Sequence, residues 1–95
     1  MNTRLFKVTN TAKWFKWCEQ LNTTLKSEAL DTLKEEGGTF ECFINFEIDN
    51  QFYSLALGDG HLPADMSKEI NQRHKEIKKE CLEKANQPDI GYLLR

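Results

Sequence analysis

His74 is the residue whose type and position point most directly to chemistry. On a helix it lies about 40° round from Ile70, so it points with the apolar stripe toward the interior. A histidine buried there could act as a general base, with its pKa lowered by burial, or could bind haem or a metal. The alternative is a core histidine that is hydrogen-bonded to a neighbouring strand or helix.

Glu28 is the second candidate for chemistry. On an unbroken helix it projects about 20° from Leu21, inside the apolar face. A buried carboxylate needs a partner, and a pair with His74 would orient the imidazole and raise its basicity. The alternative is a helix that breaks near Thr24 and leaves Glu28 in water, as a charge following Ser27 at a new helix start.

Four further residues are expected to line a ligand cavity: Trp14, Trp17, Tyr53 and Cys81. Cavities that bind small molecules are mostly apolar with a few polar groups. The alternative for the two tryptophans is a plain aromatic core. Cys81 follows His74 by two helical turns, about 10 Å, which is too far for a direct thiol–imidazole pair, so we expect a small buried hydrophobe.

The segment from Thr39 to Ile48 alternates between two faces. One is apolar, with Phe40, Cys42, Ile44, Phe46 and Ile48, and the other is half polar, with Glu41, Phe43, Asn45, Glu47 and Asp49. If the apolar face meets the helices, the half-polar face is solvated or forms part of a dimer interface. Two glutamates could act as acid and base or bind a cation, but no third ligand is visible, so no metal site is expected.

These side chains must be positioned by about six elements. Apolar periodicity and turn residues predict the following ranges: a strand at 4–9, a helix at 12–36 with a weak point at 22–24, a hairpin of strands at 39–48 and 52–57, a helix from Ser67 whose stripe ends at Ala85, and a last strand at 90–94. The order β-α-β-β-α-β favours a single α+β domain over residues 1–95 with a ferredoxin-like fold. We expect a four-stranded antiparallel sheet with both helices on one face.

Composition excludes several classes of protein. With 95 residues, 39% hydrophobic content and a net charge of −2, the chain is too apolar for disorder, and neither a membrane span nor a general affinity for nucleic acid is expected. Three cysteines without a Cys-x-x-Cys pair argue against a disulfide framework, and with no visible leader they favour the cytoplasm. The lysines at 75, 78 and 79 alternate with glutamates, which is typical of an exposed helix face.

Two segments resemble a known family. The run Ser27-Glu-Ala-Leu-Asp-Thr-Leu-Lys-Glu-Glu-Gly37 and the run Ile70-Asn-Gln-Arg-His74, followed by Cys81, are similar to small bacterial domains of unknown function grouped with the dimeric α+β barrel proteins. The resemblance implies a homodimer in which two sheets pack face to face with the helices outside. Members of that wider group include cofactor-free monooxygenases and haem-degrading enzymes, and they commonly hold ligands between helices and sheet. No catalytic residues carry over.

Together these features predict a protein that binds a small, largely apolar ligand in a helix–sheet cleft lined by Trp17, Glu28 and His74. His-based acid/base chemistry without a cofactor, of an oxygenase or isomerase kind, could take place there, with His74 and Glu28 as the catalytic residues. The alternative is a non-catalytic homodimeric structural or interaction module. A third hypothesis is haem binding through His74.

Overall fold

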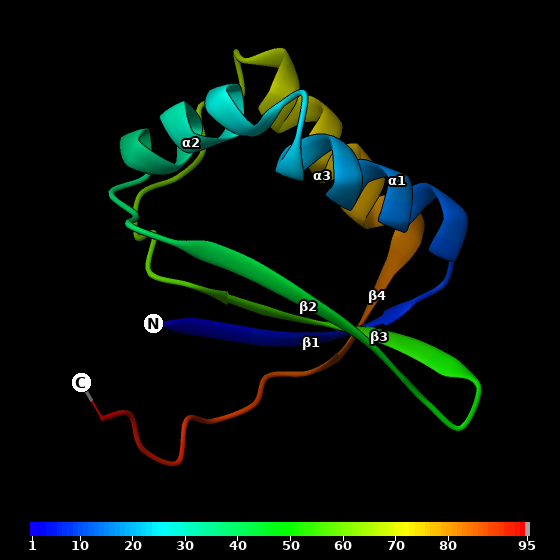
Figure 1. Ribbon diagram of the computed structural model, residues 1–95. Coiled ribbons are helices and arrows are strands. Elements are labelled where there is room, and N and C mark those ends of the chain that lie inside the picture. Colours follow the sequence, from blue (N-terminus) through cyan, green and yellow to red (C-terminus); the bar gives the residue numbers. More distant parts are fainter. Residues whose placement is uncertain (95) are drawn as a thin grey trace.

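A computed structural model describes residues 1–94 as a two-layer α+β fold, with one antiparallel sheet covered on one side by helices (Figure 1). The four strands lie in the order β2-β3-β1-β4, and every neighbouring pair is antiparallel. The elements in chain order are β1 (Asn2–Val8), α1 (Thr11–Asn22), α2 (Lys26–Glu35), β2 (Glu41–Ile48), β3 (Gln51–Gly58), α3 (Glu69–Cys81) and β4 (Leu82–Asn86). The predicted α+β class and four-stranded antiparallel sheet are confirmed, and the structure has three helices instead of the two predicted.

The predicted helix over 12–36 is two helices. The first, α1, begins where the side chain of Asn10 accepts a hydrogen bond from Lys13 N. It ends at the predicted weak point, where Thr23 Oγ1 donates to Glu19 O. Hydroxyl side chains that bond to nearby backbone groups compete with helix continuation. The amide of Leu25 still reaches Gln20 O, and α2 restarts one residue later. The break near Thr24 is therefore the correct alternative, and the helical phase is reset.

The last strand lies eight residues earlier than the prediction of 90–94. Helix α3 ends at Cys81, and β4 follows at once, pairing Leu82 with Val8 and Glu83 with Lys7 at the edge of β1. This pairing satisfies backbone groups that β1 would otherwise leave open on that side. The chain after β4 runs beneath the sheet on the side away from the helices, where Thr3 Oγ1 donates to Pro88 O (Figure 1).

The two faces of β2 point the opposite way from the orientation considered for the hairpin. Asn45 is paired with Ser54 in the sheet and contacts Trp14 of α1, so the half-polar face meets the helices. The apolar residues of β2 face away, and Ile44 and Ile48 are 46% and 55% exposed. We call this surface the outer sheet face. Strand alternation and register assign to it Leu5 of β1, Cys42, Ile44, Phe46 and Ile48 of β2, and Tyr53, Leu55 and Leu57 of β3.

The core lies between the helices and the sheet. Its buried members are Val8, Trp14, Trp17, Ile70 and Cys81. Phe43 of β2 packs its ring against Trp14 at a centroid distance of 5.3 Å, which holds α1 against the sheet. Within residues 1–94, no helix has the length and apolar character needed to cross a membrane.

Candidate functional site

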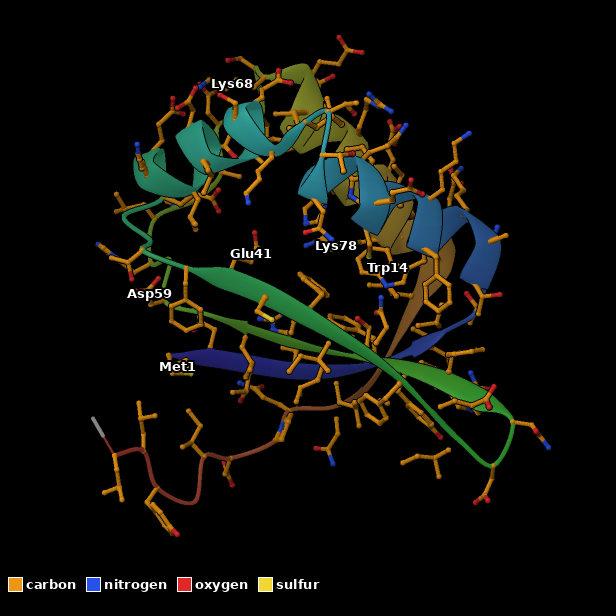
Figure 2. All side chains as sticks on the ribbon, in the orientation of Figure 1. Met1, Trp14, Glu41, Asp59, Lys68 and Lys78 are labelled. Atoms are coloured by element: carbon orange, nitrogen blue, oxygen red, sulfur yellow. The ribbon has the colours of Figure 1, made fainter. Side chains whose placement is uncertain are left out.

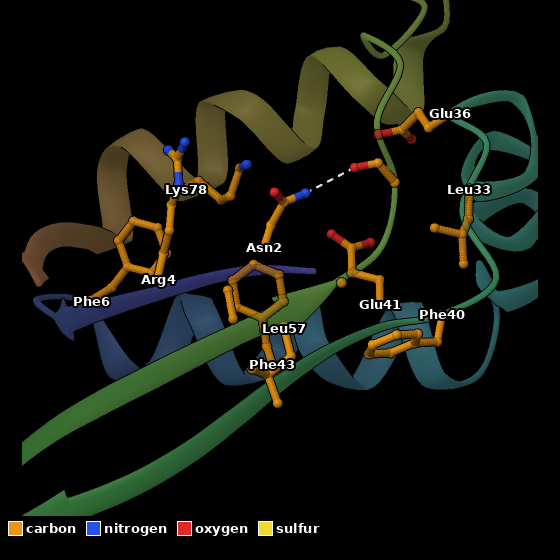
Figure 3. A pocket seen from close by; sticks show the side chains of 13 residues that line it. Asn2, Arg4, Phe6, Leu33, Glu36, Phe40, Glu41, Phe43, Leu57 and Lys78 are labelled. Carbon is orange, nitrogen blue, oxygen red and sulfur yellow. Dashed lines mark hydrogen bonds between the residues drawn. The ribbon is translucent and has the colours of Figure 1, made fainter. Parts of the chain in front are cut away.

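Two adjacent cavities lie between the helices and the sheet, with volumes of about 400 and 440 Å³. Five residues line both of them: Leu33, Glu36, Glu41, Phe43 and Lys78. We call the two together the helix–sheet cleft. One end is charged and adds Asn2 and Arg4 of β1 (Figure 3), and the other has an apolar wall that includes Trp14, Cys18, Leu21, Ala29 and Ile70.

His74 lines the apolar end, and its ring is held by an indole. Trp17 Nε1 donates to His74 Nδ1 at 2.9 Å, and Arg73 lies over the other side of the indole, 5.1 Å from its centroid. Because Nδ1 accepts this bond, the proton of the neutral imidazole must be on Nε2. Burial, reinforced by the charge of Lys78, lowers the pKa of His74 to about 4, so the ring is neutral at pH 7.

The other nitrogen of His74 has no partner. Nε2 is buried and makes no hydrogen bond to any other part of the described chain. A buried donor left unsatisfied costs about 1–3 kcal/mol, so such groups are uncommon in folded proteins. In this tautomer His74 is a hydrogen-bond donor, and the general-base role considered from the sequence would require the proton to leave Nε2.

The shared part of the cleft holds charges of both signs. Glu41 projects from the sheet toward the helices, and Lys78 projects from the helices toward the sheet (Figure 2). Desolvation raises the pKa of Glu41, and the charge of Lys78 opposes this rise. Desolvation lowers the pKa of Lys78; the charge of Glu41 opposes this fall, and Arg4 adds to it. Desolvation also raises the pKa of Glu36, and the charge of Glu41 adds to that rise. Each charged form is therefore disfavoured by its surroundings.

None of these charged groups forms an ion pair. Among residues 1–94 the pairs within 4 Å are Lys13–Glu80 and Lys68–Glu35, both on the exposed helical side. Arg4, Glu36, Glu41 and Lys78 have carboxylate or cationic neighbours only at longer distances. The side chain of Glu41 is open to water inside the cleft although protein surrounds it on most sides.

Three local features of the sequence position the charged residues of the cleft. Lys78 follows His74 by one helical turn, so both project from the same face of α3. Glu36 ends α2 and its carbonyl accepts from the amides of His61 and Leu62, which ties the loop after β3 to the helix end. Glu41 is the first residue of β2, and the two residues before it, Thr39 and Phe40, donate hydrogen bonds to Asp59.

The structure does not bring Glu28 and His74 together. Glu28 lies in the first turn of α2 and is exposed, and the nitrogens of His74 are occupied by Trp17 or unpartnered. The reason is the new start of α2, which moves Glu28 off the apolar stripe. The predicted Glu28–His74 pair is therefore absent.

The other predicted lining residues are divided between three places. Trp14 and Trp17 are each 1% exposed; Trp14 lines the cleft, whereas Trp17 lies behind His74. Tyr53 stacks on Phe46 at 5.7 Å on the outer sheet face, so it is outside the cleft. Cys81 is fully buried in the core, as a small hydrophobe.

Several residues of the cleft were not singled out from the sequence. Lys78 was assigned to an exposed helix face, although its spacing of four from His74 could have placed it in the interior. Alternation along β1 places Arg4 on the same face as Phe6 and Val8, so its direction could have been predicted. Glu36 lies at the end of α2, where periodicity gives no direction. The alternation of β2 predicts a solvated or dimeric face for Glu41, whereas the structure places it in the cleft.

The arrangement suits an organic ligand better than a metal. No three His, Cys, Asp or Glu side chains in the described part of the chain gather as metal ligands. Haem ligation through His74 stays a prediction: iron would need the lone pair of Nε2, whereas the bond from Trp17 to Nδ1 places the proton of the neutral ring on Nε2. A neutral donor, two protonatable carboxyls and a weakly basic amine can bind a polar organic group and move protons on it.

Comparison with known proteins adds a family but no activity. No curated protein and no solved structure is significantly similar to the chain. A family of unknown function, DUF6176, matches residues 3–93, nearly the whole chain. The chain therefore belongs to this family of unknown function, DUF6176.

Proposed function

We propose that the protein binds a small organic molecule in the helix–sheet cleft and that His74 Nε2 donates a hydrogen bond to an oxygen of that ligand. The observation that carries this proposal is the buried Nε2 donor without a partner, in a side chain that lines a 440 Å³ cavity. A ligand oxygen would recover the free energy that the unsatisfied donor costs. The cavity volume suits a molecule of about ten to fifteen non-hydrogen atoms, within the range of ligand pockets.

The same geometry supports a restricted kind of catalysis. A neutral imidazole N–H can polarise a carbonyl group, and a carboxyl whose pKa is raised toward neutrality can exchange a proton with the adjacent carbon. His74 and Glu41 would take these two roles, in place of the His74–Glu28 pair expected from the sequence. Enolisation of a bound carbonyl compound is the reaction class that fits, and binding alone is sufficient for the proposal.

Two aromatic probes that differ in one oxygen test the donor. Acetophenone offers a carbonyl, and ethylbenzene has a similar shape without it. We expect the wild-type protein to bind acetophenone about tenfold more tightly, because a buried donor is satisfied in one complex and not in the other. The measurement is titration by ¹H–¹⁵N NMR with the side-chain nitrogens of His74 observed directly.

His74→Phe removes the donor and keeps an aromatic ring beside Phe43 and Trp17. This variant should bind both probes with similar affinity. Lys79→Met on the exposed part of α3 is the matched control and should retain the preference. Binding of neither probe in the cleft, or an unchanged preference in His74→Phe, contradicts the proposal.

A second candidate function, as a homodimeric module, is favoured by the outer sheet face. We infer that a second copy of the chain covers the part of this face that the segment after β4 leaves open. It spans three strands, and Lys7 is the one charged side chain that alternation assigns to it on β1, β2 and β3. A sheet with one solvated face normally places polar residues there, whereas two apolar sheet faces can pack about 10 Å apart. An antiparallel four-stranded sheet with helices on one face is also the form that the dimeric α+β barrel arrangement requires.

The dimer is tested by its sensitivity to one charge. Sedimentation should give about twice the monomer mass of 11.1 kDa for the wild type. Ile44→Asp, at the centre of β2, should give a monomer, because a buried unpaired carboxylate in the interface is costly. Leu62→Asp is the matched control, since Leu62 is 50% exposed on a loop and should leave the dimer intact. A monomeric wild type overturns the inference.

We also infer a reducing location, such as the cytoplasm. The three cysteines are free thiols, and Cys42 is exposed. Exposed free thiols are at risk of oxidation and cross-linking outside reducing compartments. Fractionation of source cells should find the protein with cytoplasmic markers, and recovery with secreted proteins would contradict this.

A further inference from the structure

The charged end of the cleft contains two pairs of like charges. Arg4 of β1 lies close enough to Lys78 of α3 to lower its pKa. On the other side Glu36, at the end of α2, lies close enough to Glu41 of β2 to raise the pKa of Glu36. Figure 3 shows the two cationic side chains on one side of the cavity and the two carboxylates on the other, with Asn2 between them.

Opposite charges also act across the cavity, but without ion pairs: Glu41 affects the pKa of Lys78 more strongly than Arg4 does, and Lys78 lowers the pKa of Glu36. Two like charges in a partly desolvated space repel each other, and none of the four groups is relieved by an ion pair within 4 Å. Ion pairs between Lys78 and the two glutamates would relieve the repulsion most simply, but no such pair forms within 4 Å, and these side chains line an open cavity. A bound cation would relieve the carboxylates, and a bound anion would relieve Arg4 and Lys78.

We propose that the ligand of the cleft is a zwitterion of the α-amino acid type, with its ammonium group between Glu36 and Glu41 and its carboxylate between Arg4 and Lys78. The four groups sum to zero charge, so a zwitterion relieves both repulsions without adding net charge. The apolar body of the ligand extends along Phe43 and Leu33 toward the apolar wall. This inference rests on the proposed binding function and names the class of its ligand.

The cleft has a charged end and an apolar end, which supports an apolar side chain on that ligand. The residues common to both cavities include Phe43 and Leu33 as well as the charged groups, so the polar and apolar ends are continuous. Trp14 and Ile70 complete the apolar wall. An amino acid with an aromatic or branched side chain matches this order of polar head and apolar body.

Four probes with the same phenyl ring test the contribution of each charge of the ligand by itself. L-phenylalanine carries both charges, 3-phenylpropionate only the carboxylate, phenethylamine only the ammonium, and ethylbenzene neither. We expect L-phenylalanine to bind most tightly, by about tenfold over each singly charged probe, since hydrogen bonds to charged groups are the stronger ones. Affinities come from NMR titration of the wild-type protein at constant ionic strength.

Two variants should change the preference in opposite directions. Lys78→Met should bind phenethylamine at least as well as L-phenylalanine, and Glu41→Gln should do the same for 3-phenylpropionate. Lys79→Met, one residue along α3 and exposed, is the control and should keep the wild-type order.

The outcomes separate the two proposals. A wild-type protein that binds the uncharged or singly charged probes in the cleft as tightly as L-phenylalanine overturns the zwitterion and leaves the binding function standing. Absence of cleft binding by all four probes and by acetophenone overturns both.

Discussion

Replacing His74 by Gln should change how the stability of the protein depends on pH. In the folded protein the pKa of His74 is lowered from 6.5 to about 4, chiefly by burial. Between those two pH values the unfolded chain binds a proton at this position and the folded chain does not. Stability is therefore fully present above pH 6.5 and is lost as the pH falls toward 4.

The magnitude follows from the size of that pKa change. At about 1.4 kcal/mol per pH unit, a fall from 6.5 to about 4 corresponds to about 3 kcal/mol of unfolding free energy. Glu36 and Glu41 act in the opposite direction in the acidic part of this range, because their pKa values are raised in the folded state. The informative quantity is therefore the difference between wild type and variant, in which the carboxyl contributions largely cancel.

Urea unfolding followed by tryptophan fluorescence gives that difference. Both tryptophans are buried in the native protein, so their emission should change strongly on unfolding. Wild type should lose about 3 kcal/mol more than His74→Gln between pH 7 and pH 4. The matched control is His61→Gln, because His61 is exposed on the loop after β3. Equal pH dependence in wild type and His74→Gln would refute a neutral, desolvated imidazole at this position.

Three further substitutions test the scaffold that positions the cleft. Asn45→Ala removes the acceptor shared by Trp14 Nε1 and Ser54 Oγ and should lower the unfolding free energy by about 2–4 kcal/mol in chemical denaturation, whereas Asn45→Asp, which keeps an acceptor, should lose less. Gly37→Ala should cost about 1–2 kcal/mol, because Gly37 has φ +72° and a Cβ there would meet a neighbouring imidazole; a wild-type midpoint would contradict this. Asp59→Asn should lower the melting temperature at pH 7, because hydrogen bonds from residues 39 and 40 hold the pKa of this carboxyl at about 2 instead of 3.8. That loss should shrink below pH 4 as the wild-type carboxylate is protonated, and an equal loss at pH 2 and pH 7 would count against the assignment.

Sequence reasoning was most successful where the pattern is regular and local. The β2–β3 hairpin follows from clean alternation and the turn at Asp49-Asn50, where both residues adopt positive φ. The burial of Trp14 and the inward direction of the partly buried His74 follow from the helical period. These features depend on neighbours within a few residues along the chain.

Errors arose where tertiary contacts decide between local alternatives. Nothing in the period of β2 says which face meets the helices. The side-chain amide of Asn45, which bonds to both Trp14 and Ser54, shows that the half-polar face does. The last strand was placed at 90–94, but the open edge of β1 pairs with the chain as soon as α3 ends.

The cleft itself was only half predictable. His74 was found from its stripe, but its protonation state depends on a tryptophan from another helix, 57 residues away in sequence. The charge pairs bring together four elements, and no local pattern says which charges from different elements will meet. The expected pair of Glu28 and His74 is absent because the break after α1 resets the helical phase of α2, where Glu28 lies.

The central claim is that the helix–sheet cleft holds a small ligand in contact with His74, Glu41 and Lys78. A crystal structure of the wild-type protein soaked with L-phenylalanine and with acetophenone tests it most directly. We expect ligand density between Phe43 and Lys78 for the amino acid, and for acetophenone a carbonyl oxygen within hydrogen-bond distance of His74 Nε2. A cleft filled by its own side chains, or both ligands bound elsewhere, would contradict the claim.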